Sequence, residues 1–517
     1  MRILYLLLLI LSVFQELYAQ HTNITITNYN SPNEPSIFID PKNPLRMMAA
    51  NNINDYYTSE DGGYTWRWGD LESPLGVWGD PCIITDTAGN FYFFHLSNPL
   101  NGEWIDRIVC QRTNDMGVSW TPGSGIGHIP GKVQDKEWAV VNPANNEIYV
   151  TWTQFDEYGS ENPNDSSIIR FSKSVNMGDT WSEAVRLSKV AGDCIDSDNT
   201  VEGAVPTVGP EGQIYVSWSG PVGIVFDRST DGGNTWLDDD IFVTEQIGGW
   251  DQPIPGIYRC NGMPVTDCDR SDGPYRGTIY INYADQKNGM ADTDIWLTKS
   301  TDGGNTWSEP VRVNDDQPGR QQFFPWMAVD QTTGKIWIVF YDRRNHSDLA
   351  TDVYLAVSSD GGETFSNVKI SEEPFIPLQT VFFGDYNNIS ATNDIVRPVW
   401  TRLHNGELSV MTAIVDPLVI GTHSQESEPF ADTYITPNPF NHSTAFSFKL
   451  HKTSKVSLSV NDVTGRKIID LINNQSMDQG KYTKILETEG YNLKPGAYFF
   501  ILNVDNRLTT RKVIFLP

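Results

Sequence analysis

The sequence predicts an all-β protein: a seven-bladed β-propeller, with six blades as the alternative, followed by a small C-terminal β-sandwich. Two observations predict it. A motif of eight residues recurs six times along the first four hundred residues, and repeats of this kind indicate stacked copies of one structural unit. After a polar linker, the end of the chain carries a different set of strand and turn signals. The expected parts are a signal peptide at 1–19, the propeller at 20–421, the linker at 422–433 and the sandwich at 434–517.

Composition narrows the class of protein. The chain has 517 residues and a formal net charge of −28, and phosphate backbones repel so acidic a chain, which excludes nucleic acid as a partner. Aromatic residues make up 12% of the sequence, including 16 Trp. Such residues favour strands, and they also form surfaces on which sugars stack.

The first nineteen residues have the pattern of a secretory leader. One Arg precedes an apolar run over 3–14, and Ala19 stands at a suitable cleavage point. The run is too short for a membrane span, and no later stretch approaches one. We therefore expect export, with no membrane-spanning segment.

Each copy of the repeated motif predicts a hairpin turn. The six copies lie at 59–66, 113–120, 174–181, 229–236, 300–307 and 358–365. Gly supplies the positive φ that the turn needs, the Asp carboxylate accepts backbone N–H groups, and the final Trp or Phe packs between sheets. The third copy has Asn176 where the others have Asp. These carboxylates are expected to be structural.

Four strand signals accompany each motif, and seven segments fit the first strand. They are PSIFIDP, DPCIITD, EWAVVNP, AVPTVGP, IPGIYRC, PWMAVDQ and GDYNNISA. The seventh unit has no motif and no fourth strand. The spare strand at 23–30 can supply that missing edge, and closing the ring in this way removes an exposed sheet edge.

Residues just before the first strands are expected to converge on one mouth of the central channel. The candidates are Glu34, Asp80, Glu137, Glu202, Asp251, Gln321 and Asp385, with Tyr386 beside the last. One interpretation is that these side chains cap strand ends. The other is an acidic ring that binds a cation or supplies acid and base groups to a sugar.

Loops after the second strands open onto the same mouth and add further charged groups. They carry His95, Asp285, Asp342, Arg343, Arg344 and Arg402. Two adjacent arginines can hold a carboxylate or sulfate. Their alternative role is to neutralise the acidic ring, and this role is slightly favoured.

Metal and disulfide signals are weak. An exported chain can form disulfides, and Cys260 and Cys268 are the best local pair; Cys82 and Cys110 could also pair, which leaves Cys194. No cofactor is required. Calcium is compatible with oxygen-rich loops such as 193–199, although a solvated loop is the favoured interpretation, and the metal-binding residues stay unassigned.

The motif resembles the Asp box, S/T-x-D-x-G-x-T-W/F, also called the BNR repeat, of sialidase-type propellers. This resemblance implies three arginines on a substrate carboxylate, a Tyr nucleophile assisted by a Glu, and an Asp acid/base. The first family Arg belongs to an F/Y-R-I-P motif, where this chain has 33–36 as NEPS; Arg46 falls on the box face instead. Arg343, Arg344 and Arg402 with Tyr386 could form a rearranged set.

The whole propeller more closely resembles secreted bacterial proteins labelled sialidase-like, through WGDP at 78–81, DKEW at 135–138, YDRR at 341–344 and FGDY at 383–386. The implied function is action on extracellular polysaccharides or glycoconjugates, as a glycosidase of exo-α-sialidase type or a polysaccharide lyase. The candidate catalytic residues are Asp80, Glu137, Asp385 and Tyr386, and the candidate substrate-binding residues are Arg343, Arg344, Arg402, Asp342 and Asp285. The alternative is a non-catalytic propeller that binds glycans or proteins at the cell surface.

The end of the chain carries four landmarks: TPNPF at 436–440, VNDVTGR at 460–466, LKPGAY at 493–498 and RKVIFLP at 511–517. Their order resembles the sorting domain of type IX secretion in Bacteroidetes. The resemblance implies a seven-stranded sandwich recognised by the export machinery. The protein would then be secreted or displayed on the surface, after Sec export and passage through the outer membrane. The alternative is an accessory binding sandwich.

Overall fold

A computed structural model describes residues 21–415 and 430–516, apart from 451, 463–465, 490, 492 and 505–506. It divides into two compact units, with the boundary between Thr422 and His423. The predicted signal peptide and most of the predicted linker lie outside the described residues. The first strand of the second unit begins at Phe430, before the predicted start at 434.

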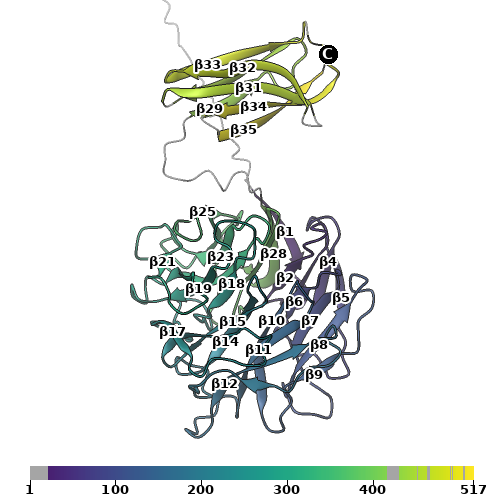
Figure 1. The fold of residues 1–517 in the computed structure, drawn as a ribbon, viewed down its shortest axis with the longest axis vertical. Coiled ribbons are helices and arrows are strands. Elements are labelled where there is room, and N and C mark those ends of the chain that lie inside the picture. The colour runs from purple at the N-terminus through teal and green to yellow at the C-terminus, as the bar shows by residue number, and fades with distance from the viewer. Residues whose placement is uncertain are drawn as a thin grey trace, which may run out of the picture. The chain divides into compact units, whose positions relative to one another are not determined.

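The first unit contains seven four-stranded antiparallel sheets, and each sheet is one blade (Figure 1). The first strands are β2 (Ser36–Ile39), β6 (Cys82–Thr85), β10 (Val133–Val141), β14 (Glu202–Val208), β18 (Val265–Cys268), β22 (Gln322–Val329) and β26 (Asn388–Thr392). The second strands are β3 (Met47–Asn51), β7 (Phe91–Leu96), β11 (Ile148–Phe155), β15 (Ile214–Gly220), β19 (Ile279–Asp285), β23 (Ile336–Asp342) and β27 (Ile395–His404). Each first strand contacts those of its two neighbours, and β26 contacts β2, so the blades close into a ring.

The outer strands complete the blades. The third strands are β4 (Asp55–Ser59), β8 (Ile108–Thr113), β12 (Ser167–Ser174), β16 (Gly223–Ser229), β20 (Asp294–Ser300), β24 (Asp352–Ser358) and β28 (Glu407–Val415). The fourth strands are β5 (Arg67–Asp70), β9 (Ser124–Ile126), β13 (Val185–Arg186), β17 (Ile241–Thr244), β21 (Val311–Arg312), β25 (Ser366–Lys369) and, for the seventh blade, β1 (His21–Thr27). Strand β1 pairs with β28, which confirms that the N-terminal strand supplies the missing edge.

One predicted first strand is wrong. Residues 254–260 (IPGIYRC) form an irregular loop, and the first strand of the fifth blade is β18 instead. Ile254, Ile257 and Cys260 are buried against the propeller core. A loop with buried apolar side chains at short intervals has the same sequence pattern as a strand, and this explains the error.

The repeated motifs are hairpin turns with a constant hydrogen-bond pattern. In the first copy, Ser59 donates to Asp61, Gly63 N–H donates to the Ser59 hydroxyl, and Thr65 donates to the other Asp61 oxygen at 2.6 Å. Asn176 keeps this pattern, since its side-chain oxygen accepts from Ser174 and from the backbone of Thr180.

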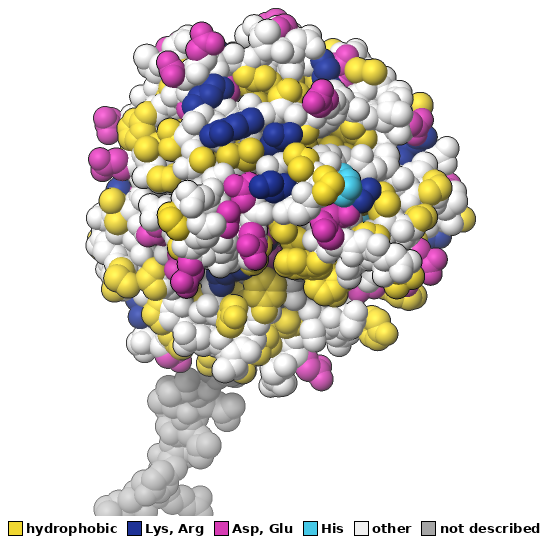
Figure 2. Space-filling model, turned by 90° about the horizontal axis from the view of Figure 1, so that it is seen from below, with side chains coloured by type: hydrophobic (Ala, Val, Ile, Leu, Met, Phe, Trp, Pro, Cys, Tyr) yellow, Lys and Arg dark blue, Asp and Glu magenta, His cyan; other side chains and the backbone are white. Residues whose placement is uncertain are grey.

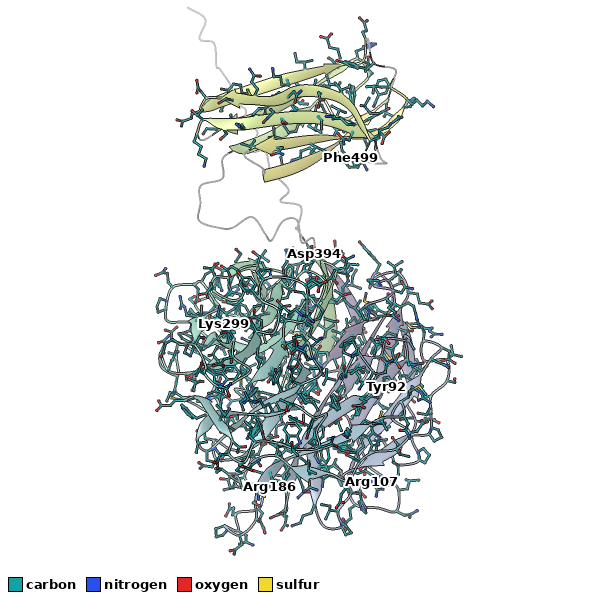
Figure 3. The ribbon with its side chains drawn as sticks, viewed as in Figure 1. Tyr92, Arg107, Arg186, Lys299, Asp394 and Phe499 are labelled. Carbon is teal, nitrogen blue, oxygen red and sulfur yellow. The ribbon has the colours of Figure 1, made fainter. Side chains whose placement is uncertain are left out.

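A cation from the preceding blade contacts every one of the six motifs. In each case its donor reaches the backbone carbonyl of the fourth motif residue. The pairs are Arg397 to Gly62, Arg67 to Met116, Arg112 to Met177, Lys173 to Gly232, Arg228 to Gly303 and Lys299 to Gly361. Lys299 is labelled in Figure 3, and its Nζ lies 2.7 Å from the carbonyl oxygen of Gly361. These bonds join neighbouring blades on the motif face and include the junction between the seventh blade and the first.

The second unit is a seven-stranded β-sandwich. One sheet has the order β29 (Phe430–Thr436), β30 (Ser443–Leu450), β33 (Gly480–Glu487). The other has the order β32 (Lys467–Met477), β31 (Ser454–Asp462), β34 (Gly496–Val504), β35 (Arg507–Phe515). Phe446 stacks on Phe500 between the sheets, and Phe440 packs on Phe515 near the end of the chain.

All five cysteines are free and buried, so the expected Cys260–Cys268 pair does not form. Cys268 ends β18 and packs in the cluster of Tyr215 and Tyr283, whereas Cys260 packs in the main core. The two thiols thus lie in different packing clusters and are not bonded to each other. Cys82 and Cys110 lie on β6 and β8, which β7 separates, and strands that are not neighbours are too distant for a disulfide.

Candidate functional site

Five blades place a residue in the left-handed backbone region two positions before a channel-lining residue. In two of them it is Gly203 (φ 74°), before Val205, and Phe324 (φ 49°), before Trp326. In the other three blades the residue is charged. Glu34, Asp80 and Lys136 each have a φ of 52°, and each lies two residues before the first channel-lining position of its strand: Ser36, Cys82 and Trp138. In the third blade the pairing register shifts between Asp135 and Trp138, which is a β-bulge. Such a conformation costs about 1–2 kcal/mol in a residue other than Gly and is often found at functional sites.

Lys136 lies at the centre of this mouth. Its ammonium is 2.8 Å from Asp385, 3.0 Å from Asp80 and 3.6 Å from Glu34. All four side chains are largely buried. The sequence pattern predicts the neighbouring Glu137 at this position, and Lys136 is not among the predicted residues. Counting two residues back from the channel-lining Trp138, as from Ser36 to Glu34 and from Cys82 to Asp80, gives Lys136.

The three carboxyl groups around Lys136 differ in acidity. Burial raises the pKa of Glu34 well above its usual value, and the Asp80 carboxylate adds to this effect. Burial also acts to raise the pKa of Asp80, but the Lys136 ammonium and hydrogen bonds with Glu34 and Lys136 together lower that pKa. The pKa of Asp385 is lowered against the effect of burial by Lys136 and Arg259. Around one ammonium, the proton affinity of Glu34 is therefore raised and those of Asp80 and Asp385 are lowered.

Arg259 is the second cation of the mouth, and the sequence analysis missed it because its loop was taken for a strand. Its Nε donates to Asp385 at 2.9 Å, and its Nη1 lies 2.8 Å from Asp196. Tyr158 also donates to Asp196. The carboxylate of Asp196, in the loop considered for calcium, is thus an arginine partner. Within the described residues, no three His, Cys, Asp or Glu side chains are grouped as metal ligands.

Asp135 lies beside this cluster and is only 8% exposed. Burial, opposed by Lys136 and reinforced by Asp80, raises its pKa to about 7. Its Oδ1 accepts the backbone N–H of Lys136 at 2.9 Å. Asp135 and Asp80 thus form a pair of carboxyl groups with unlike proton affinities.

Glu137 and Tyr386, two of the predicted catalytic residues, lie beneath the cluster. Both are buried, and burial raises the pKa of each well above its usual value. The Glu137 carboxyl oxygens and the Tyr386 hydroxyl have no hydrogen-bond partner among the described residues. The Tyr386 ring packs on Trp138, which in turn packs on Trp326 at a centroid distance of 4.3 Å. These rings separate the mouth from the apolar channel below.

The predicted substrate-binding residues have other partners. Arg344 donates to Asp342 at 2.7 Å and to Asn367 at 3.0 Å. Arg343 is fully buried; it donates to Thr351 and lies over the Phe323 ring.

Arg402 is bonded to Ser409, and Asp285 accepts backbone N–H groups of Ile247 and Lys287. These contacts do not join Arg343, Arg344 and Arg402 into one site. The structure thus brings Asp80 and Asp385 to the mouth and buries Glu137 and Tyr386 beneath it, and it places the five substrate-binding candidates in contacts of their own.

A cleft of about 180 Å³ opens above Lys136. Its floor is formed by Glu34, Asp80, Asp135, Lys136 and Arg259, and its walls include Trp78, Trp104, Tyr158 and Phe382. Trp78 and Trp104 are 41% and 44% exposed, and their rings meet edge to face. The cleft thus combines a charged floor with an exposed aromatic rim.

Two family models match the chain. Residues 278–414 match the BNR repeat-like domain, and residues 434–516 match the secretion system C-terminal sorting domain. These matches identify a BNR-repeat segment within the propeller and a type IX sorting domain in the second unit. The sorting domain indicates export to the cell surface or the exterior. No helix among the described residues has the length and apolar character needed to cross a bilayer.

Several solved structures resemble the BNR-repeat propeller. One is the ulvan lyase of polysaccharide lyase family PL25 (15% identity, 75% of this chain and 95% of that chain, TM-score 0.46). Another is the Hadza microbial sialidase Hz136 (13% identity, 73% and 74%, TM-score 0.41), and a third is the Trypanosoma rangeli sialidase (12% identity, 87% and 84%, TM-score 0.39). No curated protein matches the sequence.

Proposed function

We propose that the exported propeller binds extracellular glycans in the cleft above Lys136. The observation that carries this proposal is the exposed pair of Trp78 and Trp104 over a floor of carboxyl groups. Aromatic rings stack on the apolar faces of sugars, and carboxylates accept hydrogen bonds from sugar hydroxyls. A concave site with apolar walls and a few fixed polar groups is typical of small-molecule binding.

The floor favours binding over catalysis in one respect. Lys136 and Arg259 are each held by two or more carboxyl groups. Neither cation is free to clamp a carboxylate of the substrate, as a sialidase-type reaction requires. Tyr386 is only 3% exposed and its pKa is raised, so it is poorly placed as a nucleophile.

A second candidate function is cleavage of the bound glycan, as a glycoside hydrolase or a lyase. The specific observation in its favour is the pair of unlike carboxyl groups, Asp80 with a lowered pKa and Asp135 with a pKa of about 7. Unequal neighbours of this kind supply a base and an acid at neutral pH. In this reaction Asp80 would act as base or nucleophile and Asp135 as acid.

The purified protein tests both candidates on a glycan array. We expect Trp104→Ala to weaken glycan binding about tenfold or more, since it removes one stacking surface. Trp68→Ala is the matched control, because Trp68 is 55% exposed on the outer strand β5. Equal binding by the wild type and Trp104→Ala would refute the proposed cleft.

Turnover is measured on the glycans that bind. Hydrolysis is followed by new reducing ends, and lyase action by the ultraviolet absorbance of an unsaturated uronate. Loss of turnover in both Asp80→Asn and Asp135→Asn, with binding retained, would establish the enzyme. Binding without turnover in the wild type would leave a glycan-binding propeller.

A further inference from the structure

A second cleft adjoins the first. It has a volume of about 490 Å³, and its lining includes Gln252, Tyr258, Arg259, Met290, Gln321 and Gln379. Arg259 lines both clefts, so the two meet at this side chain. The volume lies within the range of about 300–1,000 Å³ that ligand sites occupy.

Three of the polar side chains of the second cleft are amides, those of Gln252, Gln321 and Gln379. Arg259 is already held by Asp385 and Asp196, so it offers little free positive charge. Amide groups both donate and accept hydrogen bonds, as sugar hydroxyls do. Asp251 also lines the cleft and would repel an anionic group. This lining fits an uncharged sugar better than a sialic acid, a uronate or a sulfated unit.

One buried group in the second cleft has an unused acceptor. Gln252 is 1% exposed, and its Nε2 donates to the Ala284 carbonyl at 2.9 Å. Its Oε1 has no hydrogen-bond partner among the described residues. A buried acceptor left without a donor costs about 1–3 kcal/mol, and a hydroxyl of a ligand in the cleft would remove that cost.

An aromatic rim runs along both clefts. Tyr258 is 62% exposed and packs edge to face on Phe382, which lines the first cleft. The loop that carries Tyr258 is fixed, because Gln252 N–H donates to the Cys260 carbonyl and Asn261 donates to the Asp385 carbonyl. The stacking surface is therefore held in place before a ligand arrives, which lowers the entropic cost of binding.

We propose that the second cleft is an additional sugar subsite, and that the two clefts together hold an internal stretch of an uncharged polysaccharide. This inference rests on the proposed glycan binding and adds the charge class and the length of the ligand. Tyr258 stacks on one sugar unit, Gln252 Oε1 accepts one of its hydroxyls, and Arg259 marks the passage to the first cleft.

The test is a length series of neutral oligosaccharides, from disaccharides to octasaccharides of the manno-, xylo- and β-gluco- types. Sialyllactose and heparin oligosaccharides form the anionic arm. We expect wild-type affinity to rise with length in a neutral series and to be lower for the anionic glycans. Tyr258→Ala should lose about tenfold affinity for the longest ligands and keep its affinity for disaccharides.

Two variants separate the subsite from the main cleft. Trp104→Ala should weaken binding at every length, whereas Tyr64→Ala, a change at an exposed tyrosine of the first motif, should weaken none. A wild-type affinity that is independent of length, or an unchanged length dependence in Tyr258→Ala, overturns the subsite while leaving the first cleft intact. A preference for the anionic arm overturns the charge class. Absence of binding to any glycan overturns the proposed function and the subsite together.

Discussion

Lys136 is the central cation at the mouth of the propeller. Its side chain is 5% exposed, and its ammonium lies within 3.6 Å of three carboxyl groups. Their ionised forms would be costly to bury without it, since removing one partner of a buried ion pair leaves an uncompensated charge. The left-handed backbone conformation of Lys136 is itself unfavourable, so holding the ammonium at this position also has a conformational cost.

We predict that Lys136→Met lowers the free energy of unfolding at pH 7 by about 3–5 kcal/mol, because Asp80 is left without a cation and Asp385 keeps only Arg259. The pKa of Lys136 is raised, so its contribution is complete below the ordinary lysine value and is lost only as the pH rises through the folded value. The pKa of Asp385 is lowered, so its contribution is present above about pH 4 and is lost in acid.

The difference between Lys136→Met and the wild type should therefore shrink as the pH falls below 4, where the carboxylates are protonated in the variant. Denaturant unfolding over this pH range measures it. Lys132→Met is the control, because Lys132 pairs with Asp156 at a partly exposed site and should cost less than about 1 kcal/mol. Equal effects at the two lysines would contradict the central role of Lys136.

The contribution of Asp135 to stability should change with pH in the opposite direction to that of Asp385. Its folded pKa of about 7 lies above the value of an unfolded chain, so the folded state holds an extra proton between about pH 4 and 7. Stability attributable to this group falls as the pH rises through that window. Asp135→Asn should remove the slope and be more stable than the wild type at pH 8, by on the order of 2 kcal/mol. A wild-type slope retained in the variant would exclude Asp135 as its source.

At the scale of the element, each motif turn is a small hydrogen-bonded unit joined to its neighbour. Asp302 accepts from Ser300 and from both the backbone and the hydroxyl of Thr306. These bonds, with the Thr306 hydroxyl first, lower the pKa of Asp302 to about 2. Lys299, one residue before this turn, reaches the next motif in the ring. The turn and the Lys299 side chain beside it therefore contact two neighbouring blades.

Asp302→Ala should lower the free energy of unfolding by about 1–2 kcal/mol, since it removes three hydrogen bonds from an exposed turn. Asp302→Asn should be close to neutral, because Asn176 makes the corresponding bonds in the third motif. Thermal unfolding of the two variants compares them directly. If the Asn variant loses as much stability as the Ala variant, the charge of the carboxylate stabilises the turn and the hydrogen-bond pattern alone does not.

At the scale of the whole molecule, the ring could be predicted from the sequence because the motif repeats. Each copy fixes the turn between the third and fourth strands, so the other strands follow by counting. The role of β1 also followed, because the seventh blade lacks a fourth strand in sequence and the strand signal at 23–30 was left over; the strand itself spans His21–Thr27. On the motif face the sequence determines the structure locally, turn by turn.

The mouth could be predicted only in part, since its geometry depends on irregular backbone. Asp80 and Asp385 were found, but the bulge before Trp138 places Lys136, and not Glu137, in the ring position. Arg259 comes from a buried loop whose apolar pattern imitates a strand. Neither a bulge nor a buried loop has a periodic signal in sequence.

On the face drawn in Figure 2, acidic and basic side chains are interspersed, so the net charge of −28 alone does not locate a site.

Closure of the ring by β1 leads to the last prediction. Strand β1 pairs with β28 from His21 to Thr27, and Ile26 is buried among Ile37, Val399 and Val410 between the seventh and first blades. A chain that starts after residue 30 would lose this packing and expose the edge of β28 to other molecules. We expect it to unfold at a lower temperature than a chain starting at residue 20, and to self-associate on size-exclusion chromatography.

A synthetic peptide of residues 20–30 supplies the control, because it can restore the edge without restoring the covalent link. Added in excess, it should bind the shortened protein, raise its unfolding temperature and return it to the monomer position, as expected for a ligand that binds only the folded state. A peptide with Ile26→Lys, which cannot bury its side chain between the blades, should do neither. If the shortened protein is as stable and monomeric as the longer one, six complete blades and an open seventh suffice, and β1 is not required for closure.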